Sequence, residues 1–388
     1  MGVPSVEIMN PERQKDMPFR LGYVPGLDGL RALSILAVMI YHANPDLLSG
    51  GFIGVEVFFG LSGFLITALL IQEFDNTGEI SLKTFYLRRV LRLAPALVAL
   101  LIVYCPVVFY LANFSFQRAK PLLTDALIVL FYMANWARAF NIHPPSLLAH
   151  AWSLSIEEQF YALWPPLLVL LLRNIRSRWA IAWIAFSIAV SAWALRCYLG
   201  ATGSTALRLS NGLDTKADAV MIGCVLGIIV SSNLIQESVR GILSRILRIA
   251  SPVSVGILAG ICKIAFWYDP IMFYWLFFII EILTAIIILD CIVNKDSMIN
   301  KILSLKGLVW VGTISYGLYL WHYPVFRLMK YFQLDWVRVI TLGTAITFAA
   351  TTLSFYLLEK PFLRLKKKFE IQSRKEAGRV PAVQPTEV

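Results

Sequence analysis

The sequence contains few charged residues for its length. Of 388 residues only 15% are Asp, Glu, Lys or Arg, whereas soluble domains carry about 25%. Another 58% are hydrophobic, and the mean hydropathy is +0.69. The net charge of +11 is confined to short segments between apolar stretches and to the tail, as in cytoplasmic loops of membrane proteins. We therefore predict an integral membrane protein that has a lipid bilayer, and no nucleic acid, as its partner.

Cysteine is scarce, and no regular spacing relates the five cysteines. They lie in apolar stretches without a CxxC pair, so we interpret them as small core residues and expect neither a disulfide framework nor a metal site. The sequence shows no internal repeat. Secondary transporters often consist of two related halves, so this absence does not favour a transporter. No cleavable signal peptide is evident, because the polar first 26 residues run directly into an apolar segment.

Eleven apolar stretches are long enough to be considered as membrane spans, since a helix needs about 20 residues to cross a bilayer. They lie near 27–45, 51–73, 89–112, 121–140, 151–172, 179–200, 213–232, 249–268, 271–293, 308–331 and 336–358. Six basic clusters separate them, and the positive-inside rule places every cluster in the cytoplasm. Two stretches lie between consecutive clusters, except for three between Arg92 and Arg173. We expect 121–140, with Asp125 and Arg138, to lie in the interface or to re-enter.

The predicted fold is an all-α polytopic bundle of about ten transmembrane helices, with both termini in the cytoplasm. A cytoplasmic N-terminal segment (1–26) precedes the membrane domain (27–360), and a basic cytoplasmic tail (361–388) that we expect to be disordered follows it. We expect the tail to be too short for a further domain. The plasma membrane is the expected location.

The first apolar segment contains a cation and an imidazole. Arg31 and His42 are eleven positions apart, which places both on one stripe of a helix, about 16 Å apart along its axis. Such groups are costly inside a membrane and therefore suggest function. In the predicted topology Arg31 lies near the cytoplasmic face and His42 near the outer face, with Glu157 at the depth of His42.

Two further arginines enter the membrane from the cytoplasm. Arg89 and Arg92 are three positions apart in FYLRRVLRLAPAL and share a helix face. They are either a positive-inside anchor or a clamp for phosphate groups, which guanidinium forks hold bidentately. Arg31, at a similar depth in a neighbouring span, favours the clamp.

The stretch AHAWSLSIEEQFYALWP is the most polar one inside an apolar segment. His150, Ser153 and Glu157 follow a spacing of three and then four and share a helix face, while Glu158 is turned about 100° away. The carboxylates are either solvated at the end of a span or supply the acid that orients an imidazole base.

Two other polar positions are candidates for the same cavity. Ser62 lies between Gly60 and Gly63, small residues that allow close helix packing, which is the favoured interpretation of this stretch. His322 lies mid-membrane, either as a packing residue or as a substrate contact. Glu281 and the Asp214/Lys216/Asp218 group have no assigned role.

Together these motifs resemble the acyltransferase 3 family of membrane O-acyltransferases. The family's R-x10-H is similar to Arg31 and His42, its FFxxSG to residues 58–63, its RxxR to Arg89 and Arg92, and its SxxxE to Ser153 and Glu157. The late segment YGLYLWHYP also looks like the family's conserved helix. The resemblance covers about residues 22–365 and implies ten spans, acetyl-CoA as donor on the cytoplasmic side, and an essential histidine in the first helix.

The resemblance leads to a mechanistic hypothesis. The arginines hold the phosphates of acetyl-CoA, and the pantetheine arm carries the thioester along a water-accessible passage to His42. His42, oriented by Glu157, removes the proton from a hydroxyl of a carbohydrate acceptor. Ser62, Ser153, Glu158, His150 and His322 are expected to line the cavity.

Alternatives stay open at this point. They are O-acylation of a macrolide-type small molecule, a secondary transporter or flippase, and a non-catalytic membrane sensor. The sequence does not determine the acceptor, the choice of acetyl over another acyl group, the oligomeric state or whether an acyl-enzyme intermediate forms. The possibility of a separate acceptor-side protein also stays open.

Overall fold

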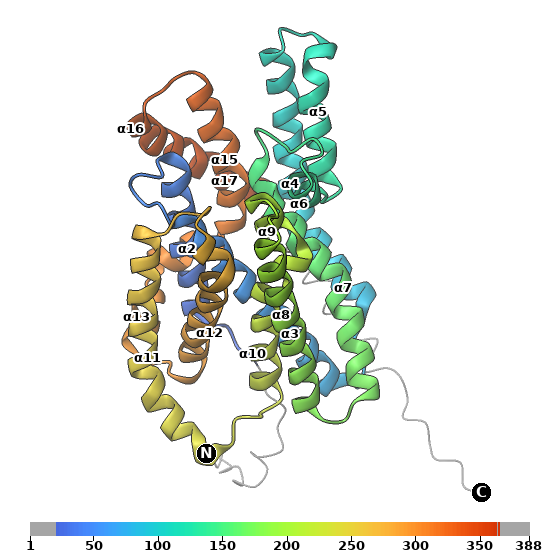
Figure 1. The fold of residues 1–388 in the computed structure, drawn as a ribbon, viewed down its shortest axis with the longest axis vertical. Coiled ribbons are helices and arrows are strands. Elements are labelled where there is room, and N and C mark those ends of the chain that lie inside the picture. The colour runs from blue at the N-terminus through green and yellow to red at the C-terminus, as the bar shows by residue number, and fades with distance from the viewer. Residues whose placement is uncertain (1–20, 363, 365–388) are drawn as a thin grey trace, which may run out of the picture.

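The computed structural model describes residues 21–362 and 364, and every regular element in that part of the chain is helical. Figure 1 shows the helices arranged mostly side by side in one bundle. The longer helices are α2 (Pro25–Ala43), α3 (Gly54–Thr77), α4 (Leu82–Leu111), α5 (Phe116–Leu130), α7 (Trp152–Asn174), α8 (Arg178–Ala201), α10 (Leu213–Ser231), α11 (Glu237–Ile264), α12 (Phe277–Val293), α15 (Ser315–Tyr331) and α17 (Thr344–Ser354). The shorter ones are η1 (Gly51–Ile53), α6 (Ala134–Ala139), η2 (Ala149–Ala151), α9 (Ala206–Asn211), η3 (Met272–Leu276), α13 (Met298–Leu303), α14 (Lys306–Thr313), α16 (Trp336–Arg338), η4 (Val339–Gly343) and η5 (Phe355–Glu359).

The all-α, polytopic class predicted from the sequence is confirmed. Among the described residues, seven helices are long and apolar enough to cross a membrane. Three more predicted spans correspond to α7, α10 and the broken pair α14–α15, which carry more charge or are shorter. The span number of ten and the side on which the termini lie stay predictions. Most of the predicted N-terminal segment and of the basic tail falls outside the described residues.

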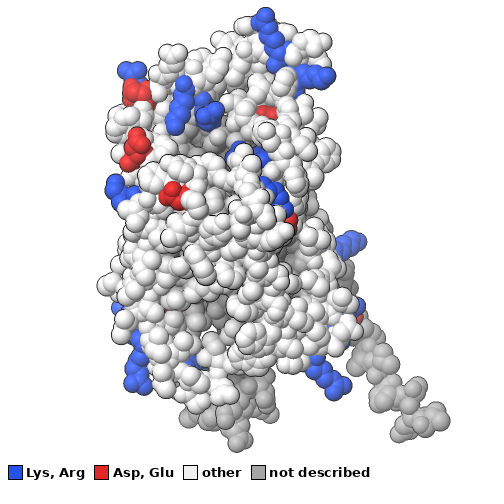
Figure 2. All heavy atoms as spheres, viewed as in Figure 1, with Lys and Arg blue, Asp and Glu red and all other residues white. Residues whose placement is uncertain are grey.

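The surface supports a membrane position for the bundle. On the face drawn in Figure 2, charged side chains gather toward the two ends, and a broad band between them is nearly free of Lys, Arg, Asp and Glu. Lipid-facing surfaces need such a band, because a charge in the hydrocarbon region is costly.

Helix α2 lies at the centre of the site and is held by close backbone packing. Pro25 occupies its first turn, where the missing N–H costs nothing. Gly29 faces α13, and a Cβ atom there would overlap the carbonyl group of Leu303. This close approach fixes the position of α2, and with it the direction of Arg31 and His42.

Ion pairs buried inside the bundle join α10 to two earlier helices. Lys216 donates to Glu56 of α3 at 2.6 Å, and Arg196 of α8 lies 2.6 Å from Asp218. All four side chains are buried, and Glu281 of α12 lies buried near them. Breaking such a pair leaves an uncompensated buried charge. The polar residues left without a role in the sequence therefore include a structural network.

Helices α4 and α5 form an antiparallel hairpin that extends beyond the rest of the bundle at one end (Figure 1). Helix α4 has 30 residues, which corresponds to about 45 Å. Helix α5 has 15 residues and ends at Leu130, before the short α6. A helix of this length is too short to cross, which agrees with the prediction that 121–140 does not span the membrane.

The predicted span 308–331 differs from the structure, because it is two helices rather than one. Helix α14 ends at Thr313 and α15 begins at Ser315, with Ile314 outside helical geometry. At the break, Gly312 packs so closely on α2 that a Cβ atom would overlap the carbonyl of Asp28. The interruption turns Ser315 toward the cavity described below.

Candidate active site

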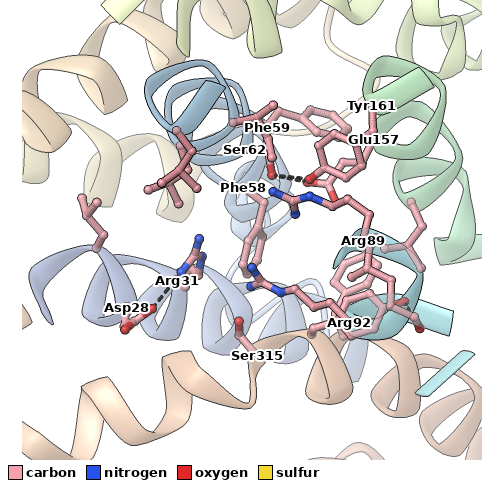
Figure 3. Close-up of a pocket in the computed structure, with 18 of the residues that line it drawn as sticks. Asp28, Arg31, Phe58, Phe59, Ser62, Arg89, Arg92, Glu157, Tyr161 and Ser315 are labelled. Carbon is pink, nitrogen blue, oxygen red and sulfur yellow. Dashed lines mark hydrogen bonds and ion pairs between the residues drawn. The ribbon is translucent and has the colours of Figure 1, made fainter. Parts of the chain in front are cut away.

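A cavity of about 400 Å³ lies among α2, α3, α4, α7 and the start of α15. Figure 3 shows side chains from these helices directed into it. Six residues predicted for the site line it, namely Arg31, Ser62, Arg89, Arg92, Ser153 and Glu157. One wall is apolar and includes Phe58 and Phe59. The cavity volume falls within the range typical of small-molecule sites.

The three arginines converge on this cavity from two sides. Figure 3 shows Arg31 on α2 facing Arg89 and Arg92 on α4. Arg31 donates to Asp28 at 2.7 Å, and Asp28 also accepts from Tyr23 at 2.9 Å. Within the described chain no carboxylate forms an ion pair with Arg89 or Arg92. Their guanidinium groups are therefore available to an anionic ligand.

Arg89 is held in place by aromatic rings. Its guanidinium carbon lies 4.7 Å from the centre of the Tyr161 ring and 5.6 Å from that of Phe85. The Tyr161 hydroxyl donates to Ser62 at 3.2 Å, and Ser62 donates to Glu157 at 2.8 Å (Figure 3). Stacking and hydrogen bonds thus orient the arginine before a ligand arrives. Tyr161 was missed by the sequence analysis, although it follows Glu157 by one helical turn.

The predicted pairing of Glu157 with His42 is wrong. The carboxylate of Glu157 accepts from Ser62 and lines the arginine cavity, whereas His42 does not line it. Glu158 does not lie beside His42 either. Together with Arg89 it lines a second cavity of about 200 Å³ on another side of α4. The reason is that α7 turns Glu157 toward Ser62 of α3, whereas His42 contacts His322 of α15.

Three of the four histidines in the chain gather beyond the cavity. His42 Nδ1 lies 3.0 Å from Nε2 of His322. The His150 ring stacks on Tyr323 at 4.9 Å and lies 5.6 Å from the His322 ring. Lys330 donates to the carbonyl of His42 at 2.8 Å. His150 and His322 therefore belong to a histidine cluster with His42 and do not line the arginine cavity as predicted.

One layer of side chains separates the arginine cavity from the histidine cluster. Tyr319 lines the cavity, and its ring lies 5.5 Å from that of His322. The Tyr319 hydroxyl is 2.6 Å from Ser153 Oγ and donates to the carbonyl of His150 at 2.9 Å. The expected continuous passage is therefore closed in this structure. Phe58, 6.4 Å from Tyr319 ring to ring, forms part of the same wall.

Metal ligands do not cluster in the region that the structure describes. Among residues 21–362 no group of three or more His, Cys, Asp or Glu side chains has the arrangement needed to hold an ion. The five cysteines are unpaired, and two of them are buried.

Comparison with known proteins shows the family to which the chain belongs. The family model for the acyltransferase domain of the acyltransferase 3 family matches residues 24–359, and the chain belongs to this family. It is similar to the peptidoglycan O-acetyltransferase OatA of Listeria monocytogenes, with 35% identity over 355 residues, 87% of this chain and 56% of that protein. A provisionally named O-acetyltransferase of Staphylococcus aureus strain COL is 34% identical over 362 residues, 88% of this chain and 58% of that protein.

A provisionally named peptidoglycan O-acetyltransferase of Bacillus subtilis is 34% identical over 354 residues, 87% of this chain and 55% of that protein. The chain thus spans a little more than half the length of these relatives. No solved structure matches the fold. The family match and the apolar helices identify the protein as a multi-pass membrane member of the acyltransferase 3 family.

Proposed function

We propose that the protein transfers an acetyl group from acetyl-CoA to a hydroxyl group of a cell-surface carbohydrate, at the plasma membrane. The observation that carries the proposal is the convergence of Arg31, Arg89 and Arg92 on one cavity. Three guanidinium groups face two carboxylates, Asp28 and Glu157, so the cavity has a net formal charge of +1. Phosphate groups suit such a site, because guanidinium forks bind them bidentately.

The remaining walls suit the rest of the donor. Phe58 and Phe59 offer apolar surface to a pantetheine arm, whose length is comparable to the distance of about 16 Å between Arg31 and His42 along α2. The thioester would then point toward the histidine cluster. In this arrangement the arginines bind the donor, and Glu157 positions Arg89 through Ser62 and Tyr161.

The proposed reaction is a direct transfer. His42 takes the proton of the acceptor hydroxyl, and the oxygen attacks the thioester carbonyl to form a tetrahedral intermediate. The carbon–sulfur bond then breaks, and the leaving thiolate takes the proton back from His42. The products are an O-acetyl ester and free CoA, and His42 returns to its neutral form.

The closed wall adds a requirement. Because Tyr319 and Phe58 lie between the cavity and the histidine cluster, they must move before the thioester reaches His42. The hydrogen bonds of Tyr319 to Ser153 and to the His150 carbonyl hold the closed position.

The acceptor proposed for the first test is a peptidoglycan glycan, because relatives are named for that substrate. Purified protein in detergent would be incubated with labelled acetyl-CoA and a panel of glycan acceptors, including fragments of peptidoglycan. Transfer of label to a glycan supports the enzyme. Movement of the acceptor across a vesicle membrane in the absence of acetyl-CoA, with no transfer of label, would instead support a transporter.

His42→Ala tests the proposed base in the same assay. General base catalysis contributes about 10²- to 10⁴-fold, so turnover should fall by at least that much. His143→Ala is the matched control, because His143 contacts Asp125 and the Pro121 carbonyl instead of the histidine cluster. Normal transfer by His42→Ala at normal abundance would remove His42 from this role.

A further inference from the structure

The hydrogen bond between His42 and His322 has only one possible direction when both rings are neutral. His322 Nδ1 lies 3.0 Å from the carbonyl oxygen of Leu318, one turn earlier in α15. A carbonyl oxygen only accepts hydrogen bonds, so His322 Nδ1 carries a proton. A neutral imidazole has a single N–H, and Nε2 of His322 is therefore an acceptor.

The proton on His42 follows from this. The nitrogen facing His322 Nε2 is His42 Nδ1, at 3.0 Å, and it must donate. His42 then has its second nitrogen, Nε2, unprotonated. In the described chain no hydrogen bond occupies that nitrogen, and His42 is only partly buried. The lone pair needed by a base is thus exposed on the side away from His322.

The alternative is that His322 is a cation and donates its Nε2 proton to His42, so that the donor and acceptor exchange roles. Its side chain is fully buried, and no carboxylate forms an ion pair with it among the residues that the structure places. Lys330 already brings a positive charge to the backbone of His42, 2.8 Å from its carbonyl. A buried cation without a counter-charge is costly, so the neutral form is favoured.

The ring of His322 is also immobilised. Tyr319 and Phe326 flank it, with ring centres 5.5 Å and 5.9 Å away, in the same helix that supplies the Leu318 carbonyl. The hydrogen-bond acceptor for His42 and the groups that fix it therefore belong to one helix, α15. The sequence separation of 280 residues between them gives no hint of this contact.

We propose that His322 is a positioning residue for His42. It holds Nδ1 of His42 protonated and Nε2 free, and it accepts the stronger hydrogen bond that His42 donates when it becomes an imidazolium during transfer. This inference rests on the proposed function of His42 as the base. It replaces the predicted carboxylate partner with a neutral imidazole that is itself fixed by a backbone carbonyl.

Three substitutions separate positioning from packing. The amide oxygen of Gln reaches the place of Nε2, so His322→Gln keeps an acceptor for His42. The shorter amide of Asn reaches only the place of Nδ1, so His322→Asn keeps the Leu318 contact without an acceptor for His42. His322→Leu removes both. A lost hydrogen bond to a charged group corresponds to about 10- to 100-fold in rate.

We therefore expect kcat of His322→Asn and His322→Leu to fall by about 10- to 100-fold while the Kd for acetyl-CoA stays unchanged. His322→Gln should retain activity within a few-fold of wild type. Equal activity of the Asn and Gln variants, at equal thermal stability, would overturn the inference. His42→Ala in the same assay tests the proposed function separately, so the two can fail independently.

A spectroscopic measurement reports the protonation of the ring nitrogens in the unmodified protein, and variants are needed only to assign the signals. The chain has only four histidines, so ¹⁵N solid-state NMR of histidine-labelled protein in bilayers resolves protonated from unprotonated ring nitrogens. The single variants His42→Asn, His143→Asn and His150→Asn assign the signals of three histidines, and the remaining signals belong to His322. We expect a proton on Nδ1 and none on Nε2 for both His42 and His322. A proton on Nε2 of His42 would refute the positioning role, whatever the activity.

Discussion

Removal of Arg89 and Arg92 together should nearly abolish donor binding. Arg89 is pre-oriented by the Tyr161 ring at 4.7 Å, so little order has to be gained when it binds a phosphate. A hydrogen bond to a charged group contributes about 1.5–3 kcal/mol, so two lost contacts weaken binding by about 10²- to 10⁴-fold. The formal charge of the cavity also changes sign. Three arginines and two carboxylates give +1 in the wild type, and one arginine and two carboxylates give −1 in the variant.

The assay is isothermal titration of the purified Arg89→Ala/Arg92→Ala protein with acetyl-CoA. Arg173→Ala/Arg176→Ala is the matched control, because it removes the same charge from exposed positions outside the cavity. Acetyl-pantetheine, which has no phosphate, should bind both variants and the wild type equally. An unchanged Kd for acetyl-CoA in a variant of normal thermal stability would refute the phosphate clamp.

Two further predictions concern stability, measured by thermal unfolding in detergent. Lys216→Met leaves the buried Glu56 carboxylate unpaired and should lower the free energy of unfolding by about 3–5 kcal/mol. Adding Glu56→Gln should restore most of the lost stability. A Lys216→Met variant as stable as wild type would contradict the network. Gly63→Ala should cost about 1–3 kcal/mol, because the added Cβ overlaps the Val220 carbonyl. Gly256→Ala, with nothing within 4 Å, is the control and should not destabilise.

Helical spacing was sufficient to predict which residues of one helix line the arginine cavity together. Arg89 and Arg92 are one turn apart on α4, and Ser153 and Glu157 are one turn apart on α7, so each pair shares a face whatever its neighbours are. The apolar stretches likewise predicted an all-α membrane bundle. Both results depend only on local geometry, which the order of residues determines.

Contacts between distant helices could not be predicted in this way. His42 and His322 are 280 positions apart, and neither helix pattern shows which faces meet. Glu157 was placed with His42 because depth was counted along straight spans, whereas its partner depends on the rotation of α7 toward Ser62. The break at Ile314 was missed because a composition window averages over one non-helical residue.

In the FFxxSG segment, close helix packing and cavity lining occupy adjacent positions. Gly63 faces α10 with no room for a side chain, whereas Ser62 faces the cavity and donates to Glu157. Both interpretations considered for this stretch therefore hold, each for a different residue.

The buried ion pairs bear on how the chain enters the membrane during synthesis. Glu56 and Arg196 are translated before Lys216 and Asp218, their partners on α10. A charged residue at a helix centre costs about 2.5–3.5 kcal/mol on insertion, so α10 is a poor candidate to integrate alone. Counter-charges already present in the nascent bundle would offset that cost, and α10 would be retained in the bilayer only after α3 and α8 had assembled.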